Sequence, residues 1–232
     1  MAPLDKLTNE SSANQEISFR TACKKSDASI EKIDCGAKRG PCPDKVVGPA
    51  SELSRMTQFT YQMTKSRSSS PCLILILESP HTSEFAKNGL GEKPAPARGA
   101  TGYLIRQHIL SISDLIPTPN VELMLMNAIQ WQCSLGERPL KKRQRDAIFS
   151  EFWKTGGAAD FGARLKDYVR PGDIVFNCCT KGSTAGKPLQ ELVQEVICAT
   201  LYEMHDVSAF VGNHPASWRS ANNRTAKSCW KS

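Results

Sequence analysis

The sequence predicts an α/β domain, a three-layer α/β/α sandwich with a central four-stranded parallel sheet. Four short apolar segments, each almost continuous, recur at wide intervals at 73–77, 122–128, 173–178 and 207–212. Such segments are typical of strands that are covered on both faces. The segments between them have helical periodicity, and alternation of strand and helix favours parallel strands joined by crossover helices.

The connecting segments predict the helices of the two outer layers. They read TGYLIRQHILSISDLI, RQRDAIFSEFW, AADFGARLKDYV and KPLQELVQEVICATLYEMH. A further helix is expected over 51–67, where Leu53, Met56, Phe59 and Met63 recur at helical spacing. Residues 1–50 are rich in Ser, Lys, Asn, Gly and Pro without sustained periodicity, so we expect a disordered or irregular extension there and a domain over 51–232.

The composition is that of a globular protein with a basic surface. Of the 232 residues, 40% are hydrophobic and 23% charged, and the formal net charge is +7. This charge favours a polyanionic partner such as DNA. No apolar segment approaches the roughly 20 residues of a membrane helix, and the first residues lack the apolar segment of a secretory signal. We therefore expect a cytoplasmic protein, nucleoid-associated in a prokaryote, with no membrane partner.

The cysteines give only a weak metal signal. None of the nine forms a C-x-x-C pair, and Cys72, Cys178 and Cys198 lie in or beside segments expected in the core, where cysteine packs as a small hydrophobe. Disulfides are disfavoured in the expected compartment. No bound metal or cofactor is expected.

Polar residues follow each of the four predicted strands. Glu78-Ser79-Pro80-His81 follows the first, Asn127 ends the second, Asn177 to Thr180 ends the third, and His214-Pro215 follows the fourth. In open α/β sheets the ligand crevice lies at the carboxyl ends of the strands. We therefore expect Glu78, Asn127 and His214 at one rim.

Each of these three side chains suits a role in bond cleavage. A carboxylate orients water or stabilises positive charge, a carboxamide matches a donor and an acceptor on a base edge, and an imidazole donates to an oxygen that gains negative charge. The simpler alternatives are a solvated loop acid at Glu78, a strand-end turn at Asn127, and solvent-facing histidines at His81 and His214.

Other residues favour contact with a nucleic acid. Gly99 and Gly102 precede or begin a helix, and glycines at a helix amino end permit close approach of a phosphate, although a simple turn explains them nearly as well. Trp218 is either a core residue or a wedge that holds an extruded nucleotide out of the stack. Arg219, Arg224 and Lys227 suit phosphates, and the basic segment 140–145 is either a phosphate patch or a solvated helix face.

The order of these motifs resembles the uracil-DNA glycosylase superfamily, most closely its iron–sulfur-type branch. Residues 77–84, LESPHTSE, are similar to the family's G-E-A-P-G-x-x-E motif, and 99–105, GATGYLI, to its G-x-x-G-x-L-L segment. Asn127-Ala128-Ile129-Gln130 with Arg138-Pro139, and His214-Pro215-Ala216, resemble the two later motifs. The resemblance covers roughly residues 70–220.

The resemblance implies hydrolysis of the N-glycosidic bond of a flipped nucleotide. It implies that Asn127 reads the base, that His214 stabilises the negative charge on the departing base, and that Glu78 helps to place the water. Ser79, Pro80 and His81 would belong to the base pocket. Pro215, Trp218 and Arg219 would contact DNA, with Trp218 at the position of the family's leucine wedge.

The sequence also departs from the family pattern. Trp131 stands where the branch has a cluster cysteine, and an early C-x-x-C pair is absent, so no iron–sulfur cluster is expected. The family's base-stacking aromatic falls near Ala97, and Leu77 and His81 replace two glycines. A smaller stacking residue favours a bulkier or modified pyrimidine over uracil.

The leading hypothesis is a monomeric, monofunctional DNA glycosylase that acts on a damaged or modified pyrimidine, in base-excision repair or in defence against modified foreign DNA. The alternatives are a catalytically silent nucleic-acid-binding module on the same fold and a hydrolase of small nucleotides.

Overall fold

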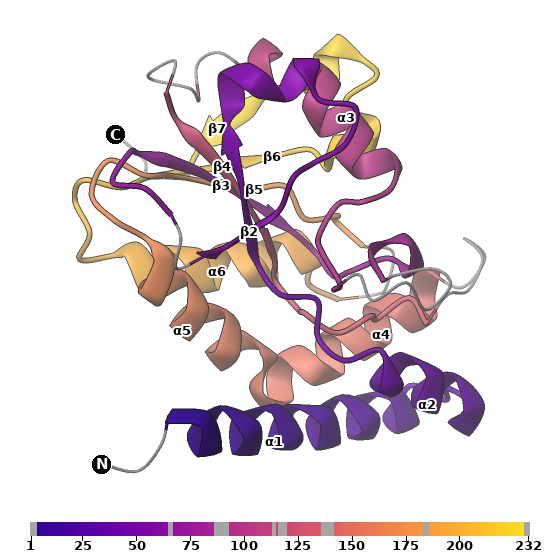
Figure 1. Ribbon diagram of the computed structural model, residues 1–232. Helices are drawn as coiled ribbons and strands as arrows, with labels where there is room; N and C mark the ends of the chain where they lie inside the picture. The colour runs from indigo at the N-terminus through magenta and orange to yellow at the C-terminus, as the bar shows by residue number, and fades with distance from the viewer. Residues whose placement is uncertain are drawn as a thin grey trace.

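The computed structural model describes residues 4–64, 67–85, 93–112, 115, 120–135, 142–182 and 186–229. Within these residues one sheet of seven strands has the order β2-β1-β4-β3-β5-β6-β7 (Figure 1). The strands are β1 Lys45–Pro49, β2 Gln62–Met63, β3 Cys72–Leu77, β4 Glu122–Asn127, β5 Ile174–Asn177, β6 Ser208–Gly212 and β7 Ala226–Ser228.

The centre of the sheet is formed by the four strands predicted from the apolar segments. β4, β3, β5 and β6 are neighbours in that order and pair in parallel. The sheet as a whole is mixed, because β1 pairs antiparallel with β4 and with β2, and β7 pairs antiparallel with β6. The prediction of an α/β fold is confirmed, while a sheet of four parallel strands alone is too small.

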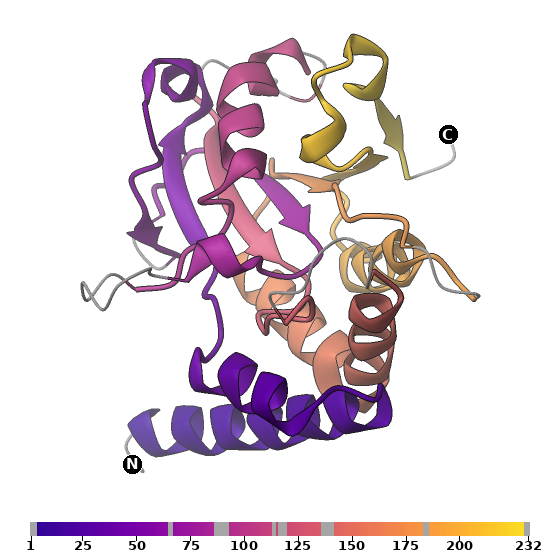
Figure 2. The same cartoon turned by 90° about the vertical axis from the view of Figure 1, so that its right-hand side faces the viewer.

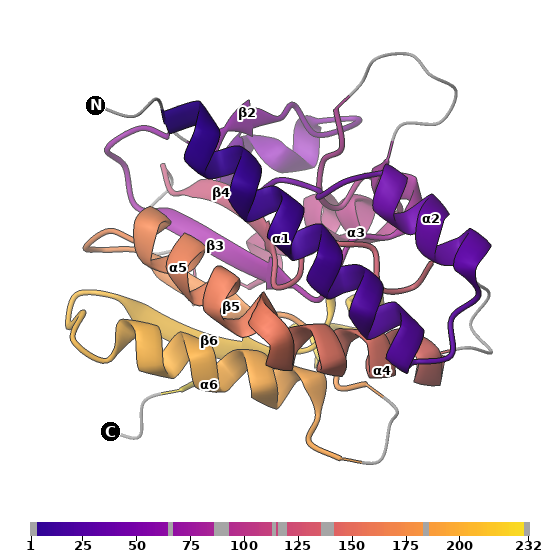
Figure 3. The same cartoon turned by 90° about the horizontal axis from the view of Figure 1, so that it is seen from below.

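Helices cover both faces of the sheet. They are α1 Leu4–Lys25, α2 Ile30–Lys38, α3 Ala100–His108, α4 Lys142–Phe152, α5 Ala158–Tyr168 and α6 Leu189–Leu201. α3 and a 3-10 helix at Ala50–Arg55 lie on one face, and α4, α5 and α6 lie on the other (Figure 2). α1 lies across α4 as an additional outer layer (Figure 3).

The alternation of side chains along β3 connects the two halves of the core. Ile74 and Ile76 pack toward α4, α5 and α6, while Leu73, Leu75 and Leu77 pack toward α3. All five are at most 3% exposed. This explains why the strand is apolar at consecutive positions, since both of its faces are covered.

The expectation of a disordered or irregular segment over 1–50 is wrong for the described residues from Leu4 onward, which form α1, α2 and β1. α1 buries Phe19, Ala22 and Cys23 on one side, and the Phe19 ring stacks on Trp131 with centroids 5.2 Å apart. These few apolar positions are enough to anchor a polar helix on the main core. The domain therefore includes this segment.

The helix expected over 51–67 is also wrong beyond its first turn. The 3-10 helix ends at Arg55, and the chain has no further helix before β2, with a bend at Thr57 and Gln58. Thr57, Phe59, Thr60 and Tyr61 are β-branched or aromatic and favour extended backbone. Leu53 and Phe59 still pack into the core on the α3 side, although they do not belong to one amphipathic helix.

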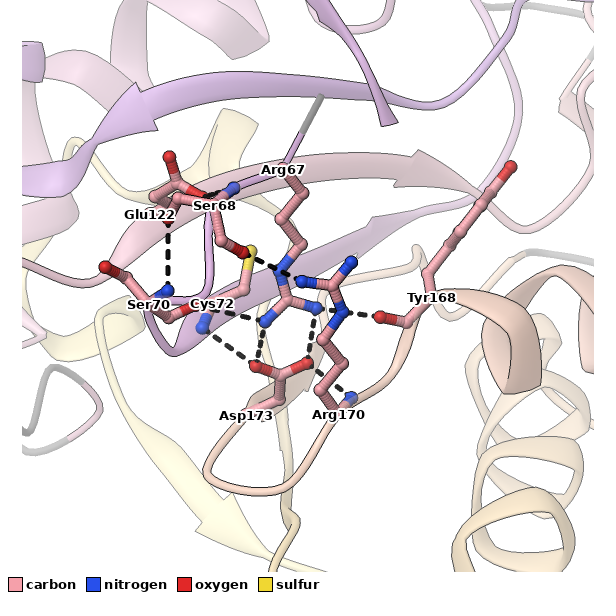
Figure 4. A network of polar contacts seen from close by, with 8 residues as sticks. All are labelled: Arg67, Ser68, Ser70, Cys72, Glu122, Tyr168, Arg170 and Asp173. Atoms are coloured by element: carbon pink, nitrogen blue, oxygen red, sulfur yellow. Dashed lines mark hydrogen bonds and ion pairs between the residues drawn. The ribbon is translucent and has the colours of Figure 1, made fainter. Parts of the chain in front are cut away.

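A buried ion pair connects β3 and β5 at their amino ends, the edge opposite the predicted crevice (Figure 4). The Arg67 guanidinium donates to both carboxylate oxygens of Asp173, with one Nη1–Oδ2 distance of 2.8 Å. The same carboxylate accepts from the backbone N–H groups of Cys72 and Arg170, each at 2.9 Å. Asp173 thus fixes three chain segments at one edge of the sheet.

Candidate active site

A cavity lies at the carboxyl ends of the central strands. The chain leaves β3 toward α3 on one face and leaves β5 toward α6 on the other, so the sheet has its topological switch point between these strands. The cavity volume is about 180 Å³. Its lining consists of Leu77, Glu78, Ser79, Pro80, His81, Glu84, Thr101, Ser134, Arg145, Thr180 and His214. Glu78 and His214, predicted to share a rim, are therefore both in its wall.

Glu78 is held in the cavity wall by three neighbours. The Thr180 hydroxyl and the Ser79 hydroxyl donate to its carboxylate, the latter at 3.3 Å, and Arg145 Nε lies 3.2 Å from Oε1. The side chain is almost completely buried. Burial raises the pKa of Glu78, and Arg145 and the Thr180 hydroxyl oppose this shift by stabilising the charged form.

Arg145 is a cavity residue that the sequence did not single out, because it lies in the basic segment 140–145. It projects from α4 and also binds Asp146, whose Oδ1 lies 2.7 Å from its Nε. Its neighbour Arg143 is exposed on the same helix. The two arginines differ in burial because they lie on different faces of α4. The side chains of Lys141 and Lys142, the other basic residues of the segment, lie outside the described part of the structure.

His214 has a defined tautomer. Its Nδ1 accepts a hydrogen bond from the Ala216 N–H at 3.1 Å, so in the neutral ring the proton is on Nε2. Burial, followed by the positive charge of Arg145, lowers the pKa of His214 to about 4. At neutral pH the cavity therefore contains an uncharged imidazole that donates through Nε2.

Glu84 is a second buried carboxyl group in the cavity wall. Backbone groups of His81 and Ala97 hydrogen-bond to it, and Asn127 Nδ2 lies 3.4 Å from Oε2. These contacts favour the charged form, but burial dominates and raises the pKa of Glu84 to about 7. Near neutral pH this group is therefore partly protonated, and its hydroxyl form is a hydrogen-bond donor.

Asn127 lies behind Glu84 and is absent from the cavity lining. Its side chain is 1% exposed, and Oδ1 has no hydrogen-bond partner in the described part of the chain. The expected carboxamide is thus buried beside the cavity rather than in its wall. A group that reached it would first have to displace or hydrogen-bond to Glu84.

Ser79, Pro80 and His81, which we expect in a base pocket, line this cavity. Pro80 is buried, while His81 is exposed and its Nδ1 accepts from the Ser83 N–H at 3.3 Å, which caps a short 3-10 helix at Thr82–Glu84. This turn brings Glu84 back to the cavity. The short turn that follows β3 therefore brings a second carboxyl group, Glu84, into the same wall as Glu78.

Ala97 does not face the cavity, contrary to its expected place in the base pocket. It is fully buried in the core beneath α3, at a φ of 56°. A Cβ added to Gly102 would lie 1.7 Å from the Ala97 carbonyl oxygen, so Gly102 is needed for this close approach and is itself buried. Gly99 is partly exposed, and a Cβ there would lie 2.6 Å from Ser83 Oγ. The two glycines therefore serve packing.

Trp218 is a core residue, so the prediction of a wedge is wrong. The side chain is 0% exposed, its ring stacks on Phe176 at 6.3 Å, and Nε1 donates to the Asn213 carbonyl at 2.9 Å. Pro215 is also buried, whereas Arg219 is exposed. Of these three residues, only Arg219 is free to meet a phosphate. Arg138-Pro139 lies outside the described residues.

The described cysteines are free thiols. Cys23, Cys42, Cys72, Cys133, Cys178 and Cys179 are buried, and Cys198 and Cys229 are partly exposed. Packing of Cys72 and Cys178 in the core agrees with the prediction. Across the described ranges, no three His, Cys, Asp or Glu side chains gather as they would around a metal ion. Nor does any helix there have the length and apolar character to cross a bilayer.

Comparison of the chain with models of known families, with curated proteins and with solved structures gives no match. The cavity combines a buried carboxylate, an arginine, a neutral imidazole donor and a second carboxyl group that titrates near neutral pH. Perturbed titratable groups that converge in a strand-end crevice are typical of active sites.

Proposed function

We propose that the protein is a DNA glycosylase that hydrolyses the N-glycosidic bond of an extruded, damaged or modified pyrimidine nucleotide. The observation that carries the proposal is the convergence of Glu78 and a neutral His214 on one cavity at the sheet's switch point. The order of motifs that resembles the uracil-DNA glycosylase superfamily supports the same reaction.

The two groups suit the two charges of this transition state. As the C1′–N bond breaks, its electron pair moves onto the base and the sugar becomes oxocarbenium-like. His214 Nε2–H would donate to the base oxygen that gains negative charge. Glu78 would stabilise the sugar cation, align the water that adds to C1′, and accept the proton that this water loses.

The volume of the cavity favours a single base over a whole nucleotide. Cavities that enclose drug-sized ligands are roughly 300–1,000 Å³, and this one is about 180 Å³. An extruded base would fill it while sugar and phosphates remain outside. Glu84, which accepts a hydrogen bond from Asn127, would contact the polar edge of the base.

The basic character of the chain and the exposed Arg219 suit contact with a DNA backbone. These features by themselves fit a silent binding module equally well. The catalytic reading differs because it also explains why a carboxylate is buried with only partial compensation, which a binding module does not need.

A base-release assay tests the proposal. Oligonucleotides carrying uracil, hypoxanthine, hydroxymethylcytosine or glucosylated hydroxymethylcytosine would be incubated with wild type, His214→Ala and Glu78→Gln. We expect alkali-sensitive abasic sites from one substrate with wild type, and a loss of roughly 10²–10³-fold in rate in each variant. The matched controls are His205→Ala and Glu203→Gln, two exposed positions that should retain the wild-type rate.

Two other outcomes point to the alternatives. DNA binding without release from any substrate would support a silent binding module. Base release from free nucleotides, but not from oligonucleotides, would support a hydrolase of small nucleotides.

A further inference from the structure

A second hollow lies on the α3 side of the sheet, apart from the cavity at the strand ends. Its volume is about 460 Å³, and it is lined by Thr57, Gln58, Phe59, Tyr61, Arg98 and Arg106. We refer to these six residues as the arginine cleft. None of the described residues in its lining is acidic.

The two arginines are ordered against the two aromatic rings. The Arg106 guanidinium carbon lies 5.0 Å from the Phe59 centroid, and that of Arg98 lies 5.7 Å from the Tyr61 centroid. Phe59 and Tyr61 pack edge to face, with centroids 5.9 Å apart. Stacking of this kind restricts each planar guanidinium. Arg98 also donates through Nη2 to the Lys93 carbonyl at 3.0 Å.

Arg106 is the residue that points to a ligand. Its side chain is 8% exposed, and Nε has no hydrogen-bond partner within the described part of the chain. The Phe59 ring and the carboxyl end of α3 both favour the positive charge, but neither accepts hydrogen bonds from the guanidinium. A buried Nε–H without an acceptor is costly, and an anion with several oxygens would supply the acceptor that Arg106 lacks.

We propose that the arginine cleft is a binding site for a phosphate group. Arg106 would contact it with a fork of two N–H groups, and the hydroxyl of Thr57 and the amide of Gln58 are further donors in the lining. Phosphate suits this set better than a carboxylate because it has oxygens for both the fork and the additional donors. The phosphate comes either from a nucleic-acid backbone or from a small phosphorylated molecule.

The cleft is connected to the proposed active site through residues 96 and 97. The Tyr61 hydroxyl donates to the Pro96 carbonyl at 2.8 Å, and the backbone of the next residue, Ala97, hydrogen-bonds to Glu84 in the catalytic cavity. Occupation of the cleft would therefore fix the segment that positions Glu84.

Titration calorimetry at low ionic strength tests the site without any base release, so its result is independent of the proposed reaction. The probes are inorganic phosphate, a nucleoside 5′-monophosphate and an unmodified single-stranded oligonucleotide. We expect saturable binding of at least one probe to wild type, and about tenfold weaker binding of that probe to Arg106→Gln. Arg106→Lys should restore only part of the affinity, since a lysine has no planar fork.

The controls separate this site from other basic surfaces. Arg55→Gln removes an exposed arginine outside the cleft and should bind like wild type, and Arg145→Gln tests whether the probe instead enters the catalytic cavity. A response from the oligonucleotide alone assigns the cleft to a nucleic-acid backbone, and a response from the small probes assigns it to a phosphorylated ligand. Should Arg106→Gln fail to fold, Arg98→Gln takes its place. Equal binding by the cleft variant and wild type, or loss only in Arg145→Gln, overturns the proposal.

Discussion

At the scale of single residues, burial shifts the pKa of His214 and that of Glu84 away from their ordinary values. His214 is uncharged because burial and Arg145 lower its pKa to about 4. Its role as a neutral donor is therefore available over the whole range above about pH 5. Glu84 is the group whose charge changes near neutral pH, because burial outweighs its hydrogen bonds.

Glu84 gives a prediction for stability. In the folded protein its pKa is about 7, against an ordinary value of 4.5. Between these two pH values the unfolded chain releases a proton that the folded protein retains, so folding becomes less favourable as pH rises from about 4.5 to 7 and then levels off. Glu84→Gln has no titratable carboxyl group at this position, so its stability lacks this dependence on pH. The free energy of unfolding of wild type should therefore fall by about 3 kcal/mol relative to the variant between pH 4.5 and pH 8.

Urea unfolding at several pH values measures this difference. The exposed Glu203→Gln serves as the control, for which the difference from wild type should be the same at each pH. A pH-independent difference for Glu84→Gln as well would show that this carboxyl group has the same pKa in the folded and the unfolded protein.

At the scale of elements, α4 contributes Arg145, the cation of the cavity, and the effect of this charge on its neighbours can be tested. Arg145→Gln removes a positive charge that lies 3.2 Å from Glu78 and that also acts on His214. The pKa of Glu78 and that of His214 should both rise, since each responds to this charge in the same direction. If the reaction needs an ionised Glu78 and a neutral His214, the acid limb of kcat/KM should move up by about one pH unit or more.

The comparison is with Arg143→Gln, which removes an exposed arginine from the same helix. That variant should keep the wild-type profile in a pH series of base release. A rate reduced by the same factor at every pH in Arg145→Gln would mean that the arginine contacts the substrate without tuning its neighbours.

The first turn of α3 gives a second prediction at this scale. Gly102→Ala would place a Cβ 1.7 Å from the Ala97 carbonyl oxygen, so the loop or the helix must shift. We expect a loss of about 1–3 kcal/mol in the free energy of unfolding. Gln107→Ala, at an exposed position of the same helix, should change stability little by comparison. Chemical denaturation of both variants measures this difference. Equal stability would show that the loop at Ala97 and the first turn of α3 can move apart without cost.

The elements also show how far the sequence was sufficient. Continuous apolar segments identified the four parallel strands, and their polar ends identified Glu78 and His214 as cavity residues, because both signals are local in sequence. Phe19, Arg145 and Trp218 were missed or misread. Their roles depend on which face of a helix or turn meets the core, and a single polar helix or a lone tryptophan does not specify that.

At the scale of the whole molecule, the two edges of the sheet have different tasks. The carboxyl ends of β3 and β5 carry the cavity, where Glu78 is buried at a cost. The amino ends carry the Arg67–Asp173 pair, in which the buried charges are matched by one another and by backbone groups. The buried charges at the amino-end edge are therefore better compensated than Glu78 at the carboxyl-end edge.

This division predicts that the two edges can be separated by mutation. Asp173→Ala leaves the Arg67 guanidinium buried without its carboxylate and leaves the Cys72 and Arg170 N–H groups without an acceptor. The free energy of unfolding should fall by roughly 3–5 kcal/mol. Asp206→Ala removes an exposed acid nearby and should cost far less.

At temperatures where Asp173→Ala is still folded, its catalytic cavity should be intact, so the rate of base release per folded molecule should equal that of wild type. A variant that is as stable as Asp206→Ala, or that folds but loses base release, would show that the two edges are not independent.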